Sequence, residues 1–375
     1  MKYYVIAGEA SGDLHGANLI KSLKGIDSNA QFRVWGGDKM EAAGADLVKH
    51  YKDHAFMGIV PVIKNLGTIR QNLKEVVKDI EIFLPDALIL IDYSGFNLRV
   101  AKKVRQLGIT IFYYISPQVW AWRQSRVHDI KMLTDKVFTI LPFEKEFYKK
   151  FDVDVEYVGH PLLDSIKEFD DGFTISEEEF RKKNKLSSKP IVALIPGSRK
   201  QELQAQLPVM LGVMRNFPDY QFVIAGMRSI KPEIYSGYID NYDISIILDQ
   251  TYELLSFSEA ALVTSGTATL ETALFNVPEV VCYRAGTLSY LLVKNLVKIQ
   301  FISIVNLIMG RKVVNELIQN DLTIDKVSEE LNLLLGDKNY KNELMNGYKE
   351  LKSKLGGPGA SLRAAQSMNK ILNSE

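Results

Sequence analysis

Residues 3–20 read YYVIAGEASGDLHGANLI and decide the fold of the N-terminal part of the chain. The apolar run Tyr3–Ile6 predicts a buried strand, and the pattern after Leu14 predicts a helix. A dinucleotide-binding protein would carry the glycine pattern G-x-G-x-x-G in the turn between them. Here the turn reads GEASGD, and the carboxylate of Glu9 would repel a phosphate. The stretch therefore predicts a strand–loop–helix unit whose loop has another purpose.

The same alternation of short apolar segments and helical patterns continues through the chain. The predicted strands are 3–8, 31–37, 87–93, 110–116, 136–142, 155–160, 190–199, 220–227, 244–249, 260–266 and 279–284. Nearly continuous apolar strands separated by helices indicate an α/β fold with parallel sheets covered on both faces. A polar stretch at 166–189 separates two such series. We therefore expect Rossmann-like domains at 1–166 and 167–345, and a C-terminal helical segment at 346–375 that packs back across them.

The composition is that of an ordinary globular protein. The chain has 375 residues, 46% of them hydrophobic, a net charge of +1 and one cysteine, Cys282. This charge argues against bulk attraction to nucleic acid, and a single cysteine rules out an internal disulfide and favours a reducing compartment. The strand pattern starts at once, so we expect no secretory signal. Lys294, Asn295 and Lys298 interrupt the most apolar stretch, 287–310, which predicts no spanning helix and a cytoplasmic chain.

Ligands of open parallel sheets bind beyond the carboxyl ends of the strands, so the loops at those ends are the candidate sites. Asp92 follows the strand at 87–91. A carboxylate that emerges from a buried strand can have a raised pKa and act as a general base. Alternatively, Asp92 only orders the loop or caps the next helix, and Asn97 is better placed for the cap. The residues alone leave both interpretations open.

Two loops in the second half are typical of phosphate binding. Each enters a helix, one through Gly197-Ser198-Arg199 and the other through Ser265-Gly266-Thr267-Ala268-Thr269. Free N–H groups and the helix dipole attract anions there, and arginine can donate two hydrogen bonds to phosphate oxygens. A lone loop of this kind is usually an N-cap. Two such loops in the second half of the chain predict a nucleotide-diphosphate site there.

Glu271 lies one turn into the second of these helices. It is either a solvated carboxylate beside the dipole or an acceptor for two ribose hydroxyls. His50 and His54 are four residues apart, but no further metal ligand accompanies them. We therefore predict no metal site and no required cofactor.

One segment, residues 57–66, either belongs to the core with solvated basic side chains or lies at the surface of an anionic membrane. An apolar run with a proline is followed by Lys64 and Arg70, as in interfacial segments. Its candidate membrane residues are Met57, Ile59, Val60, Val62 and Ile63. Trp120 and Trp122 either lie at such a boundary or pack near the site.

Taken together, these motifs resemble those of the lipid-A-disaccharide synthase family. The similar stretches are AGEASGDLHGANLI (7–20), MGIVPVI (57–63), YYISPQVWAWRQSRV (113–127), LPFEKEFY (141–148), VGHPLLD (158–164), IPGSRKQEL (195–203), SGTATLE (265–271), NLIMGRKVVNELIQ (306–319) and GGPGASLRAA (356–365). They span nearly the whole chain, and SPQVWAWRQ together with AGEASGD is highly specific.

The resemblance implies a GT-B fold of two Rossmann-like domains that face a cleft, the first for the acceptor and the membrane and the second for UDP. It implies transfer of 2,3-diacylglucosamine from its UDP derivative to 2,3-diacylglucosamine 1-phosphate. The products are the β-1,6-linked disaccharide 1-phosphate and UDP. The family is inverting and metal-independent, acts at the inner face of the cytoplasmic membrane, and is compatible with a homodimer.

The resemblance also assigns roles to residues. Asp92 takes the position of the catalytic base, with Glu9, Ser11, Gly12 and His15 on the acceptor side. The donor residues are Ser198, Arg199, Ser265, Gly266, Thr267, Thr269, Glu271, Asn306, Glu316 and Gln319. The family commonly has D-x-P-D-F-N, but Gly95 here replaces the second carboxylate. Glu9 and His15 both remain candidates to assist Asp92. Asn315 stands where a proline is common.

Two alternatives remain. A UDP-N-acetylglucosamine 2-epimerase would share the fold and the UDP site without a lipid acceptor, and analysis of the products separates it. A non-catalytic lipid- or UDP-binding protein would have no turnover to lose in an Asp92→Asn variant.

Overall fold

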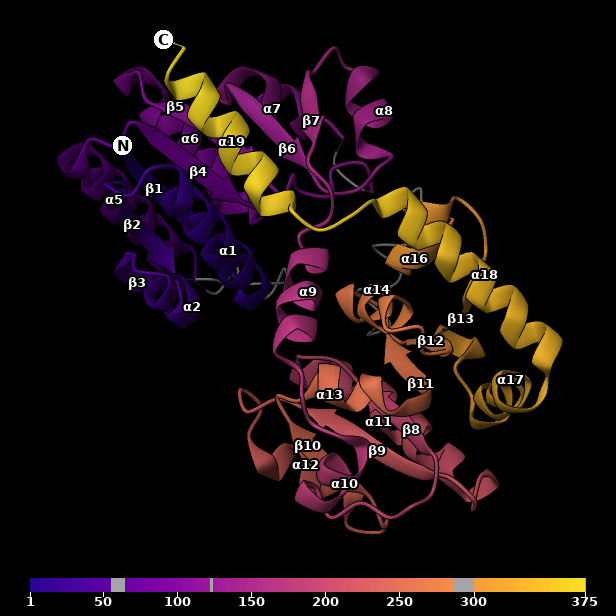
Figure 1. The fold of residues 1–375 in the computed structure, drawn as a ribbon. Coiled ribbons are helices and arrows are strands. Elements are labelled where there is room, and N and C mark those ends of the chain that lie inside the picture. Colours follow the sequence, from indigo (N-terminus) through magenta and orange to yellow (C-terminus); the bar gives the residue numbers. More distant parts are fainter. Residues whose placement is uncertain (55–64, 122–123, 286–299, 375) are drawn as a thin grey trace. The chain divides into compact units, whose positions relative to one another are not determined.

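The computed structural model describes residues 1–54, 65–121, 124–285 and 300–374 (Figure 1). The chain forms two compact units. The first consists of Met1–Glu168 together with Leu355–Glu375, and the second is Phe169–Lys354. The boundary expected after residue 166 thus falls after Glu168, and the C-terminal helix belongs to the first unit.

The first unit contains a seven-stranded parallel sheet in the order β3-β2-β1-β4-β5-β6-β7. Its strands are β1 (Lys2–Ala7), β2 (Gln31–Gly36), β3 (Asp46–His50), β4 (Ala87–Ile91), β5 (Thr110–Tyr114), β6 (Lys136–Thr139) and β7 (Val155–Tyr157). Its helices are α1 (Ala10–Ile26), α2 (Asp38–Ala42), α3 (Tyr51–His54), α5 (Leu66–Phe83), α6 (Ser94–Val104), α7 (Arg126–Leu133), α8 (Glu144–Lys149), the start of α9 (Leu162–Gly172) and α19 (Ala360–Leu372).

Both faces of this sheet are buried, as the apolar strands predict. Successive side chains of β1 enter two different cores. Tyr4 and Ile6 pack with α5, α6 and α7, whereas Tyr3, Val5 and Ala7 pack with α1 and α19. This alternation follows from the period of two residues in a strand, and helices on both faces account for the apolar run.

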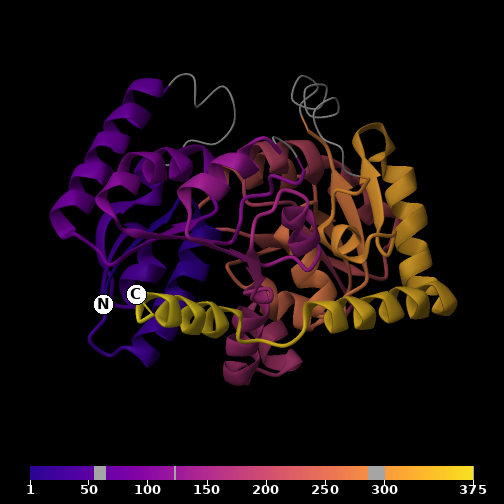
Figure 2. The same ribbon diagram turned by 90° about the horizontal axis from the view of Figure 1, so that it is seen from above.

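The C-terminal helix α19 completes the first unit. Asp164 accepts hydrogen bonds from the backbone N–H groups of Gly359, Ala360 (3.2 Å) and Ser361 (2.9 Å) at the start of the helix. Arg363 donates to the carbonyl of Val158 at 2.8 Å. Figure 2 shows the two chain ends close together, in agreement with the shallow hollow lined by Met1 and Leu372.

The second unit contains a six-stranded parallel sheet in the order β10-β9-β8-β11-β12-β13. Its strands are β8 (Ile191–Ile195), β9 (Gln221–Gly226), β10 (Ser245–Leu248), β11 (Ser258–Thr264), β12 (Glu279–Tyr283) and β13 (Asn315–Ile318). Its helices are α10 (Glu177–Lys183), α11 (Lys200–Val213), α12 (Pro232–Ile239), α13 (Thr251–Ser256), α14 (Thr267–Leu274), α16 (Ile304–Met309), α17 (Ile324–Gly336) and α18 (Lys338–Leu355).

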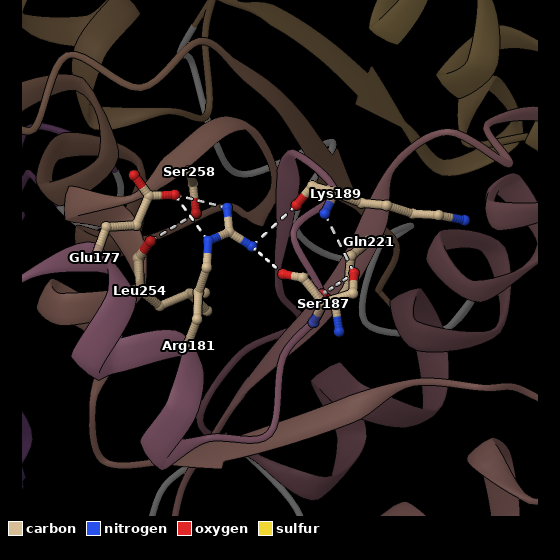
Figure 3. Close-up of polar contacts among 7 residues, drawn as sticks. All are labelled: Glu177, Arg181, Ser187, Lys189, Gln221, Leu254 and Ser258. Carbon is tan, nitrogen blue, oxygen red and sulfur yellow. Dashed lines mark hydrogen bonds and ion pairs between the residues drawn. The ribbon is translucent and has the colours of Figure 1, made fainter.

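A network around Arg181 fixes the chain where it enters this sheet (Figure 3). The guanidinium forms an ion pair with Glu177, one turn earlier in α10, at 2.7 Å. It also donates to the carbonyls of Ser187 (2.5 Å) and Lys189 (3.0 Å), just before β8. The hydroxyl and N–H of Ser187 donate to Gln221 of β9, each at 2.8 Å. One side chain therefore holds α10 against the start of the sheet.

The predicted α/β class with two parallel sheets is confirmed. The sequence pattern missed β3 and β13, which are edge strands of their sheets. Most residues of β3 and β13 are only half-buried. An edge strand lacks the continuous apolar run that marks a central strand, because less of it is covered.

Candidate functional site

Each sheet has one place where the strand order reverses, and the predicted site residues follow the strands at these two places. In the first sheet β1 and β4 are neighbours, and in the second β8 and β11 are. The connections from these strands leave toward opposite edges, and ligands of open parallel sheets bind beyond the carboxyl ends of the strands at such a point. Glu9 and Asp92 follow β1 and β4, whereas Ser198 and Ser265 follow β8 and β11.

Asp92 is held at the end of β4 by its backbone. It and Tyr93 both have left-handed conformations, with φ of 42° and 44°. The carbonyl of Asp92 accepts hydrogen bonds from the Tyr113 hydroxyl (2.6 Å) and the Asn97 amide (2.9 Å). Asn97 therefore fastens the end of the strand and does not cap α6. A left-handed non-glycine residue costs free energy, and such residues concentrate at functional sites.

Gly8 makes room for this loop. A Cβ atom at position 8 would overlap the ring of Tyr93, so only glycine allows the ring to lie against the opening loop. The two strand-end loops thereby pack against each other, which brings Glu9 and Asp92 together at the same edge of the sheet.

The carboxyl group of Asp92 is suited to proton transfer at neutral pH. Its side chain keeps some solvent access, but protein atoms surround most of it. Burial, and next the charge of Glu9, raise the pKa of Asp92 from 3.8 to about 7, against a smaller opposing contribution from the N–H of Tyr93. A general base works best when its pKa lies near the operating pH.

The other residues predicted on the acceptor side have different surroundings. Ser11 is exposed in the first turn of α1. Gly12 is buried, and a Cβ there would come within 3.0 Å of the Cβ of Ala7, so Gly12 lets α1 approach β1 closely.

His15 is buried, and the charged group that acts on its imidazole is Asp164. Burial lowers its pKa to about 4, and the charge of Asp164 acts in the opposite direction. Its Nδ1 has no hydrogen-bond partner in the described part of the chain. Burial lowers the pKa of His160 to about 3, and the charge of His15 makes a smaller contribution in the same direction. Of the two candidates to assist Asp92, Glu9 is the one whose charge acts on it.

Glu144 is a second carboxyl group near Asp92, and it is not among the site residues predicted from the sequence. It is buried and accepts hydrogen bonds from the N–H groups of Ile140 (3.1 Å) and Leu141 (2.9 Å). Burial raises its pKa to about 7, and the charge of Asp92 contributes in the same direction. The signal available in the sequence was a glutamate that closely follows the predicted strand 136–142, at the edge where Asp92 lies.

In the second unit, Ser198 and Arg199 precede α11. The N–H groups of both donate to one carboxylate oxygen of Glu202, at 2.9 and 3.2 Å. Gly197 has φ of 108° and leaves space for that carboxylate. The guanidinium of Arg199 forms an ion pair with Glu202 at 3.2 Å, and 57% of the Arg199 side chain is exposed. The loop therefore presents a cation at the edge of the sheet.

The loop at 265–269 enters α14 beside it. Ser265 donates to the carbonyl of Ile302 (2.9 Å), and Thr269 is buried and donates to the carbonyl of Gly266 (2.9 Å). These two hydroxyls thus fix the loop, whereas Thr267 is exposed. Gln206 of α11 donates to Thr264 at the end of β11 at 2.9 Å, which ties the helix after the first loop to the strand before the second.

Glu271 lies one turn further along α14 and is partly buried. The hydroxyl of Tyr252 donates to its Oε1 atom at 2.8 Å. Burial raises the pKa of Glu271, and the hydrogen bond from Tyr252 opposes this effect.

Asn306 and Glu316 bind each other and the backbone around them. The Glu316 carboxylate accepts hydrogen bonds from the Asn306 amide (2.8 Å), the Ser303 hydroxyl (2.7 Å) and the Ile302 N–H (3.0 Å). The Asn306 amide oxygen accepts from the N–H groups of Val313 and Val314 at 2.7 and 3.0 Å. These two side chains therefore hold the start of α16 against β13.

Gln319 directly follows β13. In the orientation that satisfies both amide groups, its side chain pairs with the backbone N–H (2.9 Å) and C=O (3.3 Å) of Ala285. It too holds neighbouring backbone in place.

The predicted membrane residues, Met57 to Ile63, lie outside the described residues. Within the described ranges no three His, Cys, Asp or Glu side chains are placed to bind a metal ion. None of the described helices combines the length and apolar character needed to cross a bilayer.

Comparison with known proteins first defines the class. UDP-GlcNAc 2-epimerase from Neisseria meningitidis bound to UDP-GlcNAc superposes with a TM-score of 0.71 at 12% identity, covering 99% of this chain and 100% of that one. A glycosyltransferase of kitacinnamycin superposes with a TM-score of 0.64 at 14% identity, covering 99% of both chains. The fold is the GT-B fold that glycosyltransferases and these epimerases share.

The sequence then gives the family. The profile described as lipid-A-disaccharide synthetase matches residues 3–370. The lipid-A-disaccharide synthase of Syntrophus aciditrophicus (strain SB) is 38% identical over 96% of this chain and 95% of its own length. The lipid-A-disaccharide synthase of Myxococcus xanthus (strain DK1622) is 36% identical over 98% of this chain and 97% of its own length. The chain belongs to the lipid-A-disaccharide synthase family, a family of glycosyltransferases that form the lipid A disaccharide.

Proposed function

We propose that this protein transfers 2,3-diacylglucosamine from its UDP derivative to the 6-hydroxyl of 2,3-diacylglucosamine 1-phosphate, with inversion at the anomeric carbon. The observation that carries the proposal is the Asp92 carboxyl group, whose pKa is about 7 at the reversal point of the first sheet. The family gives the reaction its class, and Asp92 supplies the base that such a transfer needs.

The proposed step is a direct displacement. The acceptor hydroxyl is too weakly acidic to attack unaided, so ionised Asp92 takes its proton as the oxygen approaches the anomeric carbon. The bond from that carbon to the diphosphate breaks with both electrons on the departing UDP. Attack opposite the leaving group converts the α linkage to β. Asp92 then returns the proton to water.

The negative charge that grows on UDP needs stabilisation in the second unit. The exposed guanidinium of Arg199 and the N–H groups of Gly266 and Thr267 at the start of α14 are suited to it. We assign Glu271 to the ribose hydroxyls. The polar groups of five other predicted donor residues bind the protein itself, so these residues would contribute to donor binding by fixing the shape of the loops. They are Ser265, Thr269, Asn306, Glu316 and Gln319.

We further propose that the protein attaches to an anionic membrane surface, where acylated substrates reside. A groove of about 330 Å³ between α5 and α6 supports this attachment. Its floor contains Leu73 and Val77, and four cations and one carboxylate line it: Arg70, Lys74, Lys78, Lys103 and Glu81. None of the four cations has an ion pair among the described residues, and unpaired cations around apolar surface suit anionic lipid.

The direct test measures UDP release from the diacylated UDP-glucosamine donor in detergent and EDTA, with and without the acceptor. We expect release that depends on the acceptor, and a disaccharide product with a β linkage by NMR. Release of UDP or 2-epimerised sugar without acceptor would favour an epimerase-like enzyme. Donor binding with no release under either condition would favour a non-catalytic binding protein.

A further inference from the structure

We propose that Tyr252 is a positioning residue that orients the Glu271 carboxylate toward the ribose hydroxyls of the bound nucleotide. The inference rests on the proposed function, because it takes the Glu271 site to be the ribose site. Tyr252 lies in α13, outside every motif that the sequence analysis singled out.

The contact between the two side chains is direct. The Tyr252 hydroxyl donates to Oε1 of Glu271 at 2.8 Å. Oε2 has no hydrogen bond to any residue that the structure describes. Each carboxylate oxygen can accept about two hydrogen bonds, so both oxygens retain capacity for ligand hydroxyls. Fixing Oε1 restricts rotation of the carboxylate and leaves Oε2 with a defined direction.

An aromatic cluster holds the ring of Tyr252 in turn. Phe275, which follows α14, lies 5.1 Å away between ring centroids, and Phe169 of α9 lies 5.4 Å away edge-on. Phe169 also packs against Phe275 at 5.8 Å and stacks on Phe173 at 4.6 Å. A ring enclosed by other rings cannot swing to follow a mobile partner. Its hydroxyl therefore has a fixed position from which to hold Glu271.

The hydrogen bond also keeps Glu271 in the form that ribose binding needs. An ionised carboxylate accepts from hydroxyls without competing donors, whereas a protonated one carries an O–H of its own. Burial raises the pKa of Glu271, and donation from Tyr252 lowers it. Loss of the Tyr252 hydroxyl would free the Glu271 carboxylate to rotate and would favour its protonation. Both effects would weaken its hydrogen bonds with the ribose hydroxyls.

The test compares UDP with 2′-deoxy-UDP, which lacks one ribose hydroxyl. A hydrogen bond to a charged group gives on the order of 10- to 100-fold discrimination, so calorimetry on the unaltered chain should show UDP binding more tightly by about that ratio. Tyr252→Phe keeps the ring and removes the donor. We expect UDP affinity to fall by roughly 3- to 10-fold. The affinity for 2′-deoxy-UDP, which keeps only the 3′-hydroxyl for Glu271, should fall less, so the ratio of the two affinities should decrease, and it should decrease further as the pH is lowered.

Three further variants distinguish a positioning role of Tyr252 from general damage to the fold. Tyr340→Phe breaks an analogous hydrogen bond, to Glu330 between α18 and α17, and should leave the ratio unchanged. Glu271→Gln should abolish most of the discrimination, and adding Tyr252→Phe to it should then have little further effect, because the two side chains act as a unit. Melting curves of each variant check the fold.

Different outcomes would overturn the role of Tyr252 and the proposed nucleotide site. An unchanged ratio in Tyr252→Phe, with the unaltered chain still discriminating, would overturn the role of Tyr252 and leave the ribose site intact. Equal affinity of the unaltered chain for both nucleotides would overturn this inference together with the ribose assignment. No UDP binding at all by the unaltered chain would overturn the donor site itself.

Discussion

If Asp92 is the base, as proposed, this one residue is useful to the reaction and costly to the fold. Its folded pKa of about 7 lies above the ordinary 3.8, so the folded state disfavours the ionised form. The penalty is absent below about pH 4, grows as the pH rises to about 7 and is complete above it. Asparagine has no charge to bury. We therefore expect Asp92→Asn to lose at least about 100-fold in turnover, yet to be more stable by about 1–3 kcal/mol at pH 8.

Thermal unfolding of both proteins at pH 4.5 and pH 8 checks the stability part. The advantage of the variant should be larger at pH 8. A variant that is equally stable, or less stable, at both pH values would show that burial of Asp92 costs nothing in the folded state.

Glu9 should set the pH at which Asp92 works. Its negative charge raises the pKa of Asp92, so Glu9→Gln should lower that pKa and shift the acidic limb of the pH profile of kcat/KM to lower pH. Ser11 is exposed in the first turn of α1, and Ser11→Ala, which removes no charge, serves as the control. An acidic limb that stays in place in Glu9→Gln would mean that burial alone tunes Asp92.

The sequence predicts the site residues that directly follow predicted strands. Asp92, Ser198 and Ser265 follow strands, and position in the chain is enough to predict which edge they occupy. The role of Tyr252 depends on its contact with Glu271 on another helix, which no local pattern reports. Glu144 does follow a predicted strand, but its nearness to Asp92 depends on the placement of β4 and β6 in the sheet. The mutual hydrogen bond of Asn306 and Glu316 was likewise invisible, although the resemblance had singled out both residues.

At the scale of elements, Arg181 connects α10 to the first strand of the second sheet. Arg181→Ala removes the ion pair with Glu177 and the hydrogen bonds to the carbonyls of Ser187 and Lys189 (Figure 3). These partners lie at the surface, where water can replace part of the loss. We expect the second unit to lose about 1–2 kcal/mol.

The control is Lys182→Ala, one position along, which should change stability by less than about 0.5 kcal/mol. Amide hydrogen exchange in β8 and β9 is the suitable measurement, because all three tryptophans belong to the first unit and would not report on the second. Unchanged exchange in Arg181→Ala would mean that α10 is held by its apolar contacts alone.

At the scale of the whole molecule, the C-terminal helix is distant in sequence from the unit that it completes. Ala364, Ala365 and Met368 of α19 are buried in the core shared with β1 and α1. A chain that ends at Lys354 loses this packing and the cap by Asp164. Its first unit should lose about 3 kcal/mol or more, seen as a lower midpoint of tryptophan fluorescence in urea.

Exchange protection of the second unit should change little in the same truncated protein, because α17 and α18 remain. Equal loss of protection in both units would show that the chain unfolds as one cooperative body and that α19 stabilises all of it.

The proposed attachment to a membrane concerns the whole molecule, and the groove between α5 and α6 makes it testable without altering residues 57–63. Replacing Lys74, Lys78 and Lys103 by glutamine removes three cations that have no ion pair with any described residue. Each lysine near an anionic leaflet contributes about fivefold in affinity, so binding to vesicles with phosphatidylglycerol should weaken by roughly 100-fold. Binding to neutral vesicles and transferase activity in detergent should stay the same, because neither depends on these charges. Lys182, Lys183 and Lys185, replaced together in the second unit, remove the same charge elsewhere. If that control weakened vesicle binding equally, net charge rather than the groove would govern attachment, and an apolar segment would have to provide the orientation.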